Sequence, residues 1–467
     1  MTSCEACTTS RATPFLSLAD EAYSVIEREL VLGRFEAGAR LSEALLSHLT
    51  GIGRTPVREA LRRLARDRLI TVRPRSGIVV NQTTRLGFER LLELRRVLQR
   101  QMAAVATVRA HRQQRLTLAR LGEEMREAVR VRDLDKAQNV DRRFKELELE
   151  ICANPFLRVA IKPSYALSRR YYFSFASKPV ADVGFRHADL IDRMAGGNID
   201  AVQAAFDRFV DALGSFASMA GTSFPGDGQS RTSARGEIEE DQLLSEQAYE
   251  RLESLIVSGH YCPGVILSAA PISSELGIGR TPVREALQHL ADNGLVSIIP
   301  RRGIVVCDFE QCDLEQLCEA RLPLEILLAR LAARRMTPEH RASLGRLMHA
   351  LSTAASSSDH VAILELDRRI KRTLVQAADN VHLGDALGPM HSIARALYFR
   401  GKTTVETDVA ESYRELLDAV ISGDEERAAG NAVCYVAETT RVMRDARARS
   451  RQVDDAQPFP SRIVAAP

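Results

Sequence analysis

The strongest constraint on this chain is a segment that occurs twice without a change. Residues 51–61 read Gly-Ile-Gly-Arg-Thr-Pro-Val-Arg-Glu-Ala-Leu, and residues 277–287 repeat them 226 positions later. The match extends further, because Ala248-Tyr249 answers Ala22-Tyr23 at the same offset. A repeat at one fixed offset means that one structural unit is used more than once. We therefore expect two full-length copies of a single unit.

The repeated segment predicts a helix with two distinct faces. Its apolar residues recur at the i, i+3, i+4, i+7 spacing that builds one buried face: Val57, Ala60, Leu61 and Leu64. Its arginines fall four apart on another face: Arg54, Arg58 and Arg62, then Arg280 and Arg284 in the second copy. Thr55 is expected to cap the N-terminus, and Pro56 fits the first helical position. An ordinary surface helix with solvated arginines would show the same pattern. The neighbouring residues therefore decide whether this is such a helix.

Those neighbours complete a winged helix. A helix is predicted at 41–49, with Ser42 as its cap, and a glycine-containing turn joins it to the repeated segment. β-Branched runs at 69–72 and 78–80 flank a turn that contains proline and glycine, which predicts two strands. Helix-turn-helix followed by a basic hairpin is the winged-helix arrangement.

Both copies resemble the winged-helix domain of the GntR family of bacterial transcription regulators. The segment 54–61, with Pro74 and Gly77 of the hairpin, matches the signature of that family, and the second copy carries it too. The resemblance implies that arginines of the repeated helix read bases in the major groove, while wing residues and helix N-termini hold phosphates. The implied DNA-binding residues are Arg54, Thr55, Arg58, Arg62, Arg73, Arg75, Gly77, Arg280, Thr281, Arg284, Arg301, Arg302 and Gly303.

After each winged helix the pattern is helical almost throughout, and it predicts an antiparallel bundle. Residues 221–241 are rich in Gly, Ser, Pro and charge, which predicts a flexible linker. The expected fold class is mainly α, with two winged helix-turn-helix domains, each with a small β-wing, and two all-α bundles. The expected boundaries are a disordered tail at 1–16, winged helices at 17–80 and 243–306, bundles at 85–219 and 309–448, a linker at 220–242 and a disordered tail at 449–467.

Each bundle resembles the FCD ligand-binding domain of the FadR-like subfamily. The resemblance rests on Glu93-Leu94-Arg95, Asp141 with Phe144, Asn154-Pro155 and His187. It implies a divalent metal held by an Asp-x-x-x-His pair and two further histidines, and a small carboxylate bound to that metal.

This sequence departs from that metal pattern in both copies. Lys145 stands four residues after Asp141, and the last histidine position falls at Phe209. In the second copy Asp367 remains, but the other three positions are Lys371, Tyr413 and Tyr435. Protonated lysine cannot ligate a metal. We therefore expect no bound metal and no other cofactor.

The two lysines leave two hypotheses open. Lys145 and Lys371 replace the charge of the metal and meet an anionic effector directly, or they neutralise Asp141 and Asp367 in buried pairs. Arg169, with its neighbour Arg170, either lies near that effector or is solvated. The predicted effector-binding residues are Arg95, Asp141, Lys145, Arg169, His187, Arg321, Asp367, Lys371 and Arg395.

Composition limits the remaining possibilities. The formal charge is only +3, so nucleic-acid binding must come from local basic patches. No apolar run is long enough to span a bilayer, and the N-terminus lacks a secretory pattern, which predicts a cytoplasmic protein. The resemblance to the GntR family implies that it is bacterial and nucleoid-associated. Cys4 and Cys7 form a lone C-x-x-C, which supplies two of the four ligands of a structural zinc and is interpreted as incidental.

These observations predict a transcription regulator, a repressor, that binds operator DNA and senses a small carboxylate. The alternative is a DNA-binding regulator whose bundles serve only for dimerisation. An enzyme is not expected, because no nucleophile–base arrangement or phosphate-binding loop is present, and intact arginines in both heads disfavour a purely structural protein. No membrane partner is expected. The chain acts either as a monomeric pseudo-dimer joined by its linker or as a homodimer.

Overall fold

The computed structural model describes residues 17–73, 77–174, 181–219, 239–299, 302–309, 313–357, 359–399 and 407–456. The predicted tail at 1–16, most of the predicted linker and the end of the chain after 456 lie outside the described residues. The chain divides into two compact units. The first comprises Met1–Arg85, Pro163–Lys178 and Ala220–Ser230, and the second comprises Leu86–Lys162, Pro179–Met219 and Arg231–Pro467.

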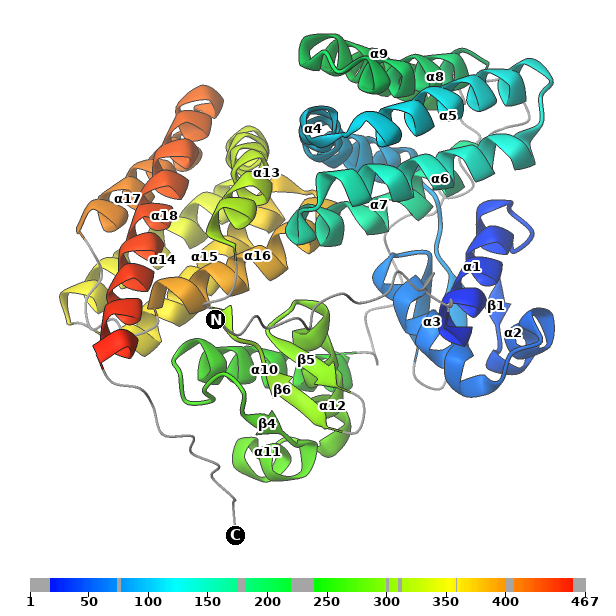
Figure 1. Ribbon diagram of the computed structural model, residues 1–467. Helices are drawn as coiled ribbons and strands as arrows, with labels where there is room; N and C mark the ends of the chain where they lie inside the picture. The colour runs from blue at the N-terminus through cyan, green and yellow to red at the C-terminus, as the bar shows by residue number, and fades with distance from the viewer. Residues whose placement is uncertain are drawn as a thin grey trace, which may run out of the picture. The chain divides into compact units, whose positions relative to one another are not determined.

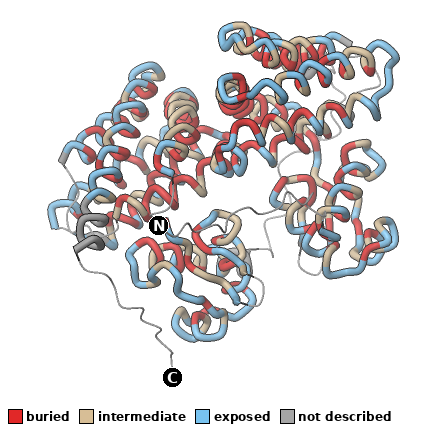
Figure 2. Tube along the Cα trace, viewed as in Figure 1, coloured by how far each residue is buried: buried red, intermediate tan, exposed pale blue. Residues whose placement is uncertain are grey.

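The first unit holds the first winged helix (Figure 1). Its elements are α1 (Leu18–Val31), β1 (Arg40–Leu41), α2 (Glu43–Thr50), α3 (Arg54–Arg66), β2 (Ile70–Arg73) and β3 (Gly77–Val80). The strands form an antiparallel sheet in the order β1-β3-β2, so the predicted hairpin gains a third strand that the sequence pattern had not indicated. Each of α1 and α3 has a buried apolar face (Figure 2). Ile26, Leu30 and Leu64 are fully enclosed.

Capping explains where two of these helices begin. Ser42 accepts a hydrogen bond from the backbone N–H of Leu45 at 3.1 Å and caps α2, as predicted. The prediction that Thr55 caps α3 is wrong, because α3 begins at Arg54 and Gly53 holds the cap position without a side-chain hydrogen bond. Thr55 therefore lies inside the first turn with its side chain exposed, and Pro56 is the third helical residue, not the first.

The second unit holds the second winged helix, which repeats the first. Its elements are α10 (Glu239–Val257), β4 (Ile266–Leu267), α11 (Ala269–Leu276), α12 (Arg280–Asp292), β5 (Val296–Ile299) and β6 (Gly303–Val306). The strand order β4-β6-β5 matches β1-β3-β2. α10 begins at Glu239, inside the range predicted as linker.

Two sets of helices follow the winged helices, in agreement with the predicted fold class (Figure 1). The first set is α4 (Arg85–Arg109), α5 (Arg112–Arg130), α6 (Leu134–Cys152), α7 (Pro155–Ser174), α8 (Ala181–Gly196) and α9 (Ile199–Met219). The second is α13 (Leu314–Arg335), α14 (Pro338–Ser356), α15 (His360–Ala378), α16 (Val381–Phe399), α17 (Thr407–Ser422) and α18 (Glu425–Ala456). α18 extends beyond the predicted end of its bundle at 448. Within the described residues, no helix combines the length and apolar character that a bilayer crossing needs.

A repeated set of contacts joins the two bundles inside the second unit. Asn154 Nδ2 donates to the carbonyl oxygen of Gln316 at 2.9 Å and to Glu319 at 2.7 Å. Its counterpart 226 residues later, Asn380, donates to the carbonyl oxygen of Arg90 at 2.9 Å and to Glu93 at 3.0 Å.

An arginine from each bundle completes the set. Arg109 pairs with Glu319 at 3.2 Å, and its counterpart Arg335 pairs with Glu93 at 2.5 Å. The same patch of each bundle thus contacts the other bundle, which is the property of a two-fold interface.

Candidate DNA interface and effector cavity

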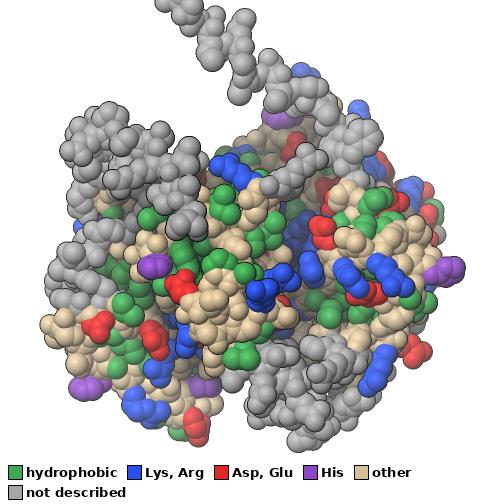
Figure 3. All heavy atoms as spheres, turned by 90° about the horizontal axis from the view of Figure 1, so that it is seen from below, with side chains coloured by type: hydrophobic (Ala, Val, Ile, Leu, Met, Phe, Trp, Pro, Cys, Tyr) green, Lys and Arg blue, Asp and Glu red, His purple; other side chains and the backbone are tan. Residues whose placement is uncertain are grey.

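Arginine side chains of α3 and α12 are exposed where the sequence predicted base contacts. Arg54, Thr55, Arg58 and Arg62 on α3 are exposed, as are Arg280, Thr281 and Arg284 on α12. Val57, Leu61 and their counterparts are buried, so the apolar face of each helix fixes the direction of its arginines. The face shown in Figure 3 carries Lys and Arg side chains interspersed with acidic ones.

The two helices that expose these arginines, called the reading helices α3 and α12, differ in one ion pair. Arg58 Nε donates to Glu43 of α2 at 2.8 Å, and both side chains are partly exposed. The position that answers Glu43 in the second copy is Ala269, so Arg284 has no counterpart of this pair. Arg58 is therefore held by an ion pair that Arg284 cannot form.

The wing residues are described only in part. Arg75 and Arg301 lie outside the described residues, and Arg73 ends β2. Gly77 and Gly303 begin the returning strands with φ of +84° and +100°, a region that glycine enters without strain. Arg302 is exposed beside Gly303.

The predicted effector residues of the first bundle are mostly buried. Lys145 Nζ lies 3.4 Å from Glu148 Oε2 on the same helix, and Arg95 donates to Gln99 at 2.7 and 3.0 Å. His187 stacks on Phe209 with ring centroids 4.7 Å apart. Its Nε2 lies 3.7 Å from Asp141 Oδ1, which is beyond hydrogen-bond distance.

Burial dominates the titration of His187. It lowers the pKa of the imidazole to about 3, and the attraction of Asp141 does not offset that effect. The ring is therefore neutral at physiological pH.

Arg169 and Arg170 of the first unit are engaged and not solvated. Arg169 pairs with Glu27 of α1. Arg170 is buried and donates to the carbonyl oxygens of Leu69, at 2.9 Å, and Asn81. Burial lowers the pKa of the Arg170 guanidinium to about 10. Both arginines thus join α7 to the first winged helix.

In the second bundle a buried carboxylate gathers three basic groups. Glu325 of α13 accepts from Arg321 Nε at 3.0 Å, lies 3.3 Å from Lys371 Nζ with both oxygens, and contacts His391 Nε2 at 2.9 Å. Burial raises the pKa of the Glu325 carboxyl, but Lys371, His391 and Arg321 together hold it well below its ordinary value.

The ion-pair partner of Lys371 is Glu325. Burial lowers the pKa of the Lys371 ammonium, and the charges of Glu325 and Asp367 both oppose that shift, so the hypothesis that Lys371 neutralises Asp367 stays a prediction. Sequence reasoning missed both Glu325 and His391. One signal was available, since Glu325 follows Arg321 at the i, i+4 spacing at which side chains share a helix face. The first copy has Gln99 and Tyr165 at these two positions, so comparing the copies gave no hint.

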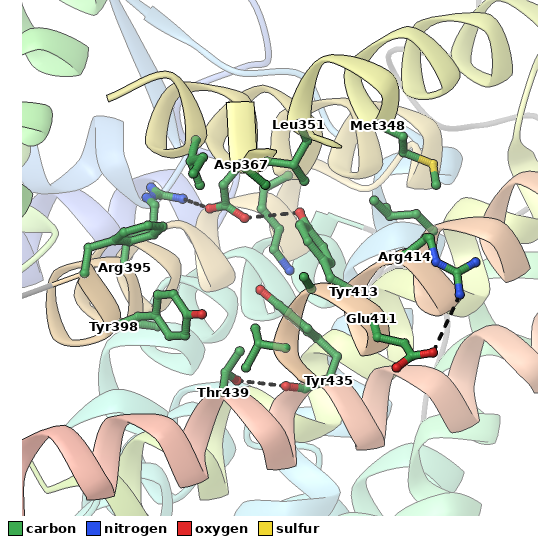
Figure 4. A pocket seen from close by; sticks show the side chains of 18 of the residues that line it. Met348, Leu351, Asp367, Arg395, Tyr398, Glu411, Tyr413, Arg414, Tyr435 and Thr439 are labelled. Atoms are coloured by element: carbon green, nitrogen blue, oxygen red, sulfur yellow. Dashed lines mark hydrogen bonds and ion pairs between the residues drawn. The ribbon is translucent and has the colours of Figure 1, made fainter. Parts of the chain in front are cut away.

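Asp367 has different partners. Tyr413 donates to its Oδ1 at 3.1 Å, and Arg395 Nη1 donates to its Oδ2 at 3.2 Å (Figure 4). Tyr413 also stacks on Tyr435, with ring centroids 4.7 Å apart, and Lys371 lies over both rings. Three of the predicted effector residues, Asp367, Lys371 and Arg395, thus line one space.

That space is a cavity of about 660 Å³ within the second bundle (Figure 4). Its charged lining includes all four predicted effector residues of the second copy, together with His391. The rest is largely apolar, with Met348, Leu351, Ile363 and Val409 among the lining residues. A cavity with a few polar groups in an apolar wall suits a small molecule with one charged end.

The donors in this space do not fit a divalent metal. Lys371 is engaged with Glu325, and Tyr413 and Tyr435 replace two histidines of the family pattern. Burial, with the charge of Asp367, raises the pKa of Tyr413 well above its ordinary value, so the phenol does not supply a phenolate ligand. In the described ranges, no group of three or more His, Cys, Asp or Glu is placed to hold an ion.

The fold and these sites define a DNA-binding transcription regulator with effector-binding domains. The model of the bacterial regulatory proteins of the gntR family matches residues 18–80 and 244–306, and the model of the FCD domain matches residues 90–212 and 316–432. The chain therefore belongs to the GntR family, with both of its domains present twice. The predicted family is confirmed, and so is the predicted function as a DNA-binding transcription regulator with effector-binding domains.

Two relatives are also named as transcriptional regulators. An uncharacterized HTH-type transcriptional regulator of Bacillus subtilis, YdhC, is 24% identical over 193 residues, which cover 40% of this chain and 86% of the relative. The Escherichia coli HTH-type transcriptional repressor RspR is 32% identical over 138 residues, covering 30% and 60%. The solved structure of E. coli McbR/YncC matches with a TM-score of 0.38 and 23% identity, over 44% of this chain and 98% of that one.

Proposed function

We propose that this chain is a repressor that holds two operator half-sites with its own two winged helices and releases DNA when a carboxylate enters the cavity of the second bundle. The observation that carries the proposal is that α3 and α12 each expose an arginine face on a buried apolar base. Arginine can donate two hydrogen bonds to O6 and N7 of guanine, so such a face suits base readout in the major groove. RspR, the relative that is 32% identical, is itself named a transcriptional repressor.

A single chain supplies both heads in this proposal. The reciprocal contacts of Asn154 and Asn380 support it, because they join the two bundles as a two-fold dimer interface would. The half-sites need not be identical. Gln288 replaces Arg62, and Ala269 replaces Glu43, so the two reading helices offer different side chains to DNA.

The effector is a carboxylate that binds without a metal. Support comes from the cavity, which combines Arg395 and Lys371 with a largely apolar wall. After dialysis against zinc or nickel and removal of free metal, we expect no tightly held ion in the protein by elemental analysis. One retained ion per bundle would contradict this part of the proposal.

Substitution of the reading arginines tests the DNA-binding proposal. Arg58→Ala and Arg284→Ala should each weaken binding to an operator fragment by about 1–3 kcal/mol and relax specificity at one base pair. Arg112→Ala is the control, because Arg112 is an exposed arginine of α5, outside both heads. Fluorescence anisotropy with fragments of the upstream region measures all three. Equal affinity of R58A, R284A and the unaltered chain would refute the assignment.

The alternative, in which the bundles only join the two halves, draws on the same Asn154 and Asn380 contacts. A thermal-shift screen of chelator-treated protein against carboxylates separates the two functions. A ligand at about 100 times its Kd stabilises the native state by about 2.7 kcal/mol, which raises Tm. A panel without any stabilising carboxylate would favour the joining role.

A further inference from the structure

One carboxylate of the second winged helix is buried against the second bundle. Glu253 of α10 is only 1% exposed. It accepts hydrogen bonds from Arg368 Nε at 2.8 Å, from Ser392 Oγ at 2.5 Å and from Arg395 Nη2 at 2.5 Å. Burial raises the pKa of the Glu253 carboxyl, but Arg395 and Arg368 more than offset this and hold it at about 2. Glu253 is thus a charged anchor between the head and α15 and α16.

Arg395 links that anchor to the cavity. Its Nη2 holds Glu253 while its Nη1 donates to Asp367, and its side chain lines the cavity (Figure 4). Its Nε is buried and has no hydrogen-bond partner among the described residues. Leaving a buried donor without an acceptor carries a free-energy cost. An acceptor inside the cavity would remove that cost.

The unused donor lies on the same edge of the guanidinium as Nη2. Carboxylates bind arginine most strongly when two oxygens face two parallel N–H groups. A carboxylate that satisfies Nε in this way also takes one N–H of Nη2, the nitrogen that donates to Glu253 and Ser392 in the structure. Ligand and head would therefore compete for one edge of one side chain.

We propose that the effector carboxylate binds the Nε–Nη2 edge of Arg395 in competition with Glu253, so that an occupied cavity detaches α10 and frees the second winged helix. The inference rests on the proposed effector function of the same cavity and adds how that cavity controls DNA binding. By linkage, the factor by which a bound carboxylate weakens the hold of Glu253 on Arg395 equals the factor by which that hold weakens carboxylate binding.

The first copy is anchored differently. Arg169 also pairs with Glu27, but Ala166 takes the position of Ser392, and Arg142, which answers Arg368, pairs with Glu146 of its own helix. Its second anchor is Arg170, which donates to backbone carbonyl oxygens, and the second copy has Ala396 there. The competition at Arg395 therefore controls the second head, and the first head keeps an anchor of backbone acceptors.

Calorimetric titration of the full, chelator-treated chain tests the competition, with 4-phenylbutanoate as the probe and 4-phenylbutanamide as its uncharged analogue. Glu253→Gln removes the competing charge and should tighten binding of the carboxylate by about tenfold. Arg368→Gln should weaken it, because Glu253 then depends more on Arg395. A general loosening of the head would instead shift both variants in the same direction.

Two controls come from the exposed ion pair between the same helices. Arg372 of α15 pairs with Glu250 of α10 and does not line the cavity. Glu250→Gln and Arg372→Gln make the same changes in charge and should leave probe affinity within about twofold of the unaltered chain, as expected for a partly exposed pair. Hydrogen exchange gives an independent readout, in which the carboxylate should speed exchange in α10 and leave α1 unchanged.

The outcomes distinguish the proposed competition at Arg395 from the proposed effector function of the cavity. Tighter binding to E253Q, weaker binding to R368Q and faster exchange in α10 would support the competition. Equal binding to the unaltered chain and E253Q would overturn the competition and leave the effector function standing. If the carboxylate binds none of the variants, or the amide binds equally well, the effector function falls and the competition falls with it.

Discussion

At the scale of single residues, Glu325 matters more to the second bundle than the basic groups around it. Glu325→Ala leaves Arg321, Lys371 and His391 facing one another without a carboxylate, and should cost about 3–5 kcal/mol. Lys371→Met leaves Glu325 with two partners and should cost less, about 1–3 kcal/mol. Hydrogen exchange of α13 amides measures both. A larger loss for K371M than for E325A would contradict the assigned hierarchy.

His187 gives the first bundle a pH dependence of known sign. Its pKa is about 3 in the fold against 6.5 when unperturbed, so the unfolded state binds the proton more readily. The contribution of His187 to the free energy of unfolding is fully present above pH 6.5 and is lost as the pH drops toward 3. The loss is about 1.4 kcal/mol at pH 5.5. His187→Phe keeps the ring stacking on Phe209 and should remove this component from unfolding curves recorded between pH 7.5 and 5. An unchanged slope in H187F would assign the dependence to other groups.

At the scale of elements, a glycine sets the approach of α15 and α16. A Cβ at Gly384 would lie 2.6 Å from Val375 Cγ1. Gly384→Ala should therefore destabilise the second bundle by about 1–3 kcal/mol, through overpacking. Gly345→Ala on α14 is the control, because nothing lies within 4 Å of its Cβ, and alanine there should stabilise the helix by about 0.5–1 kcal/mol.

A second substitution tests the cause of that loss. In a Val375→Ala background the obstructing methyl groups are absent, so Gly384→Ala should cost less than it does alone. Additive losses in thermal unfolding of the two single variants and the double variant would show that the glycine is needed for another reason.

At the scale of the whole molecule, one chain should by itself supply both halves of the two-fold arrangement of the bundles. Light scattering is expected to give the mass of one chain, 51.7 kDa. Replacing Asn154 and Asn380 together by Ala removes four hydrogen bonds between the bundles. The double variant should keep both folded bundles and lose cooperative binding to a two-half-site operator. A mass of two chains for the unaltered protein would mean that four heads are presented instead.

The sequence was sufficient for features that depend on local periodicity. The apolar spacing of Val57, Ala60, Leu61 and Leu64 predicted α3 and its buried face, because i, i+3, i+4 and i+7 side chains share one side of any helix. It was insufficient for the start of that helix, where Gly53 and not Thr55 is the cap. Capping depends on backbone dihedrals at one residue, and several neighbouring residues of this sequence could have adopted them.

In the candidate site, too, some residues were predictable from the sequence and others were not. Asp367, Lys371 and Arg395 were predicted from matching positions, and all three line the cavity. Their partners were not predictable in this way, since Glu325 comes from another helix of the bundle and Glu253 from the other domain. The DNA-contacting and effector-contacting roles of these residues, the absence of a metal and the cytoplasmic, nucleoid-associated location stay predictions.

The sequence by itself determined that this protein contains two winged helices and two helical bundles, because an exact repeat and short-range apolar spacing survive any arrangement in space. Only the tertiary structure decided which carboxylate each buried cation meets. Glu253 and Arg395 are separated by 142 residues yet lie 2.5 Å apart. An ion pair of this kind depends on how helices pack, and helix packing is fixed by the whole set of buried side chains rather than by any local pattern.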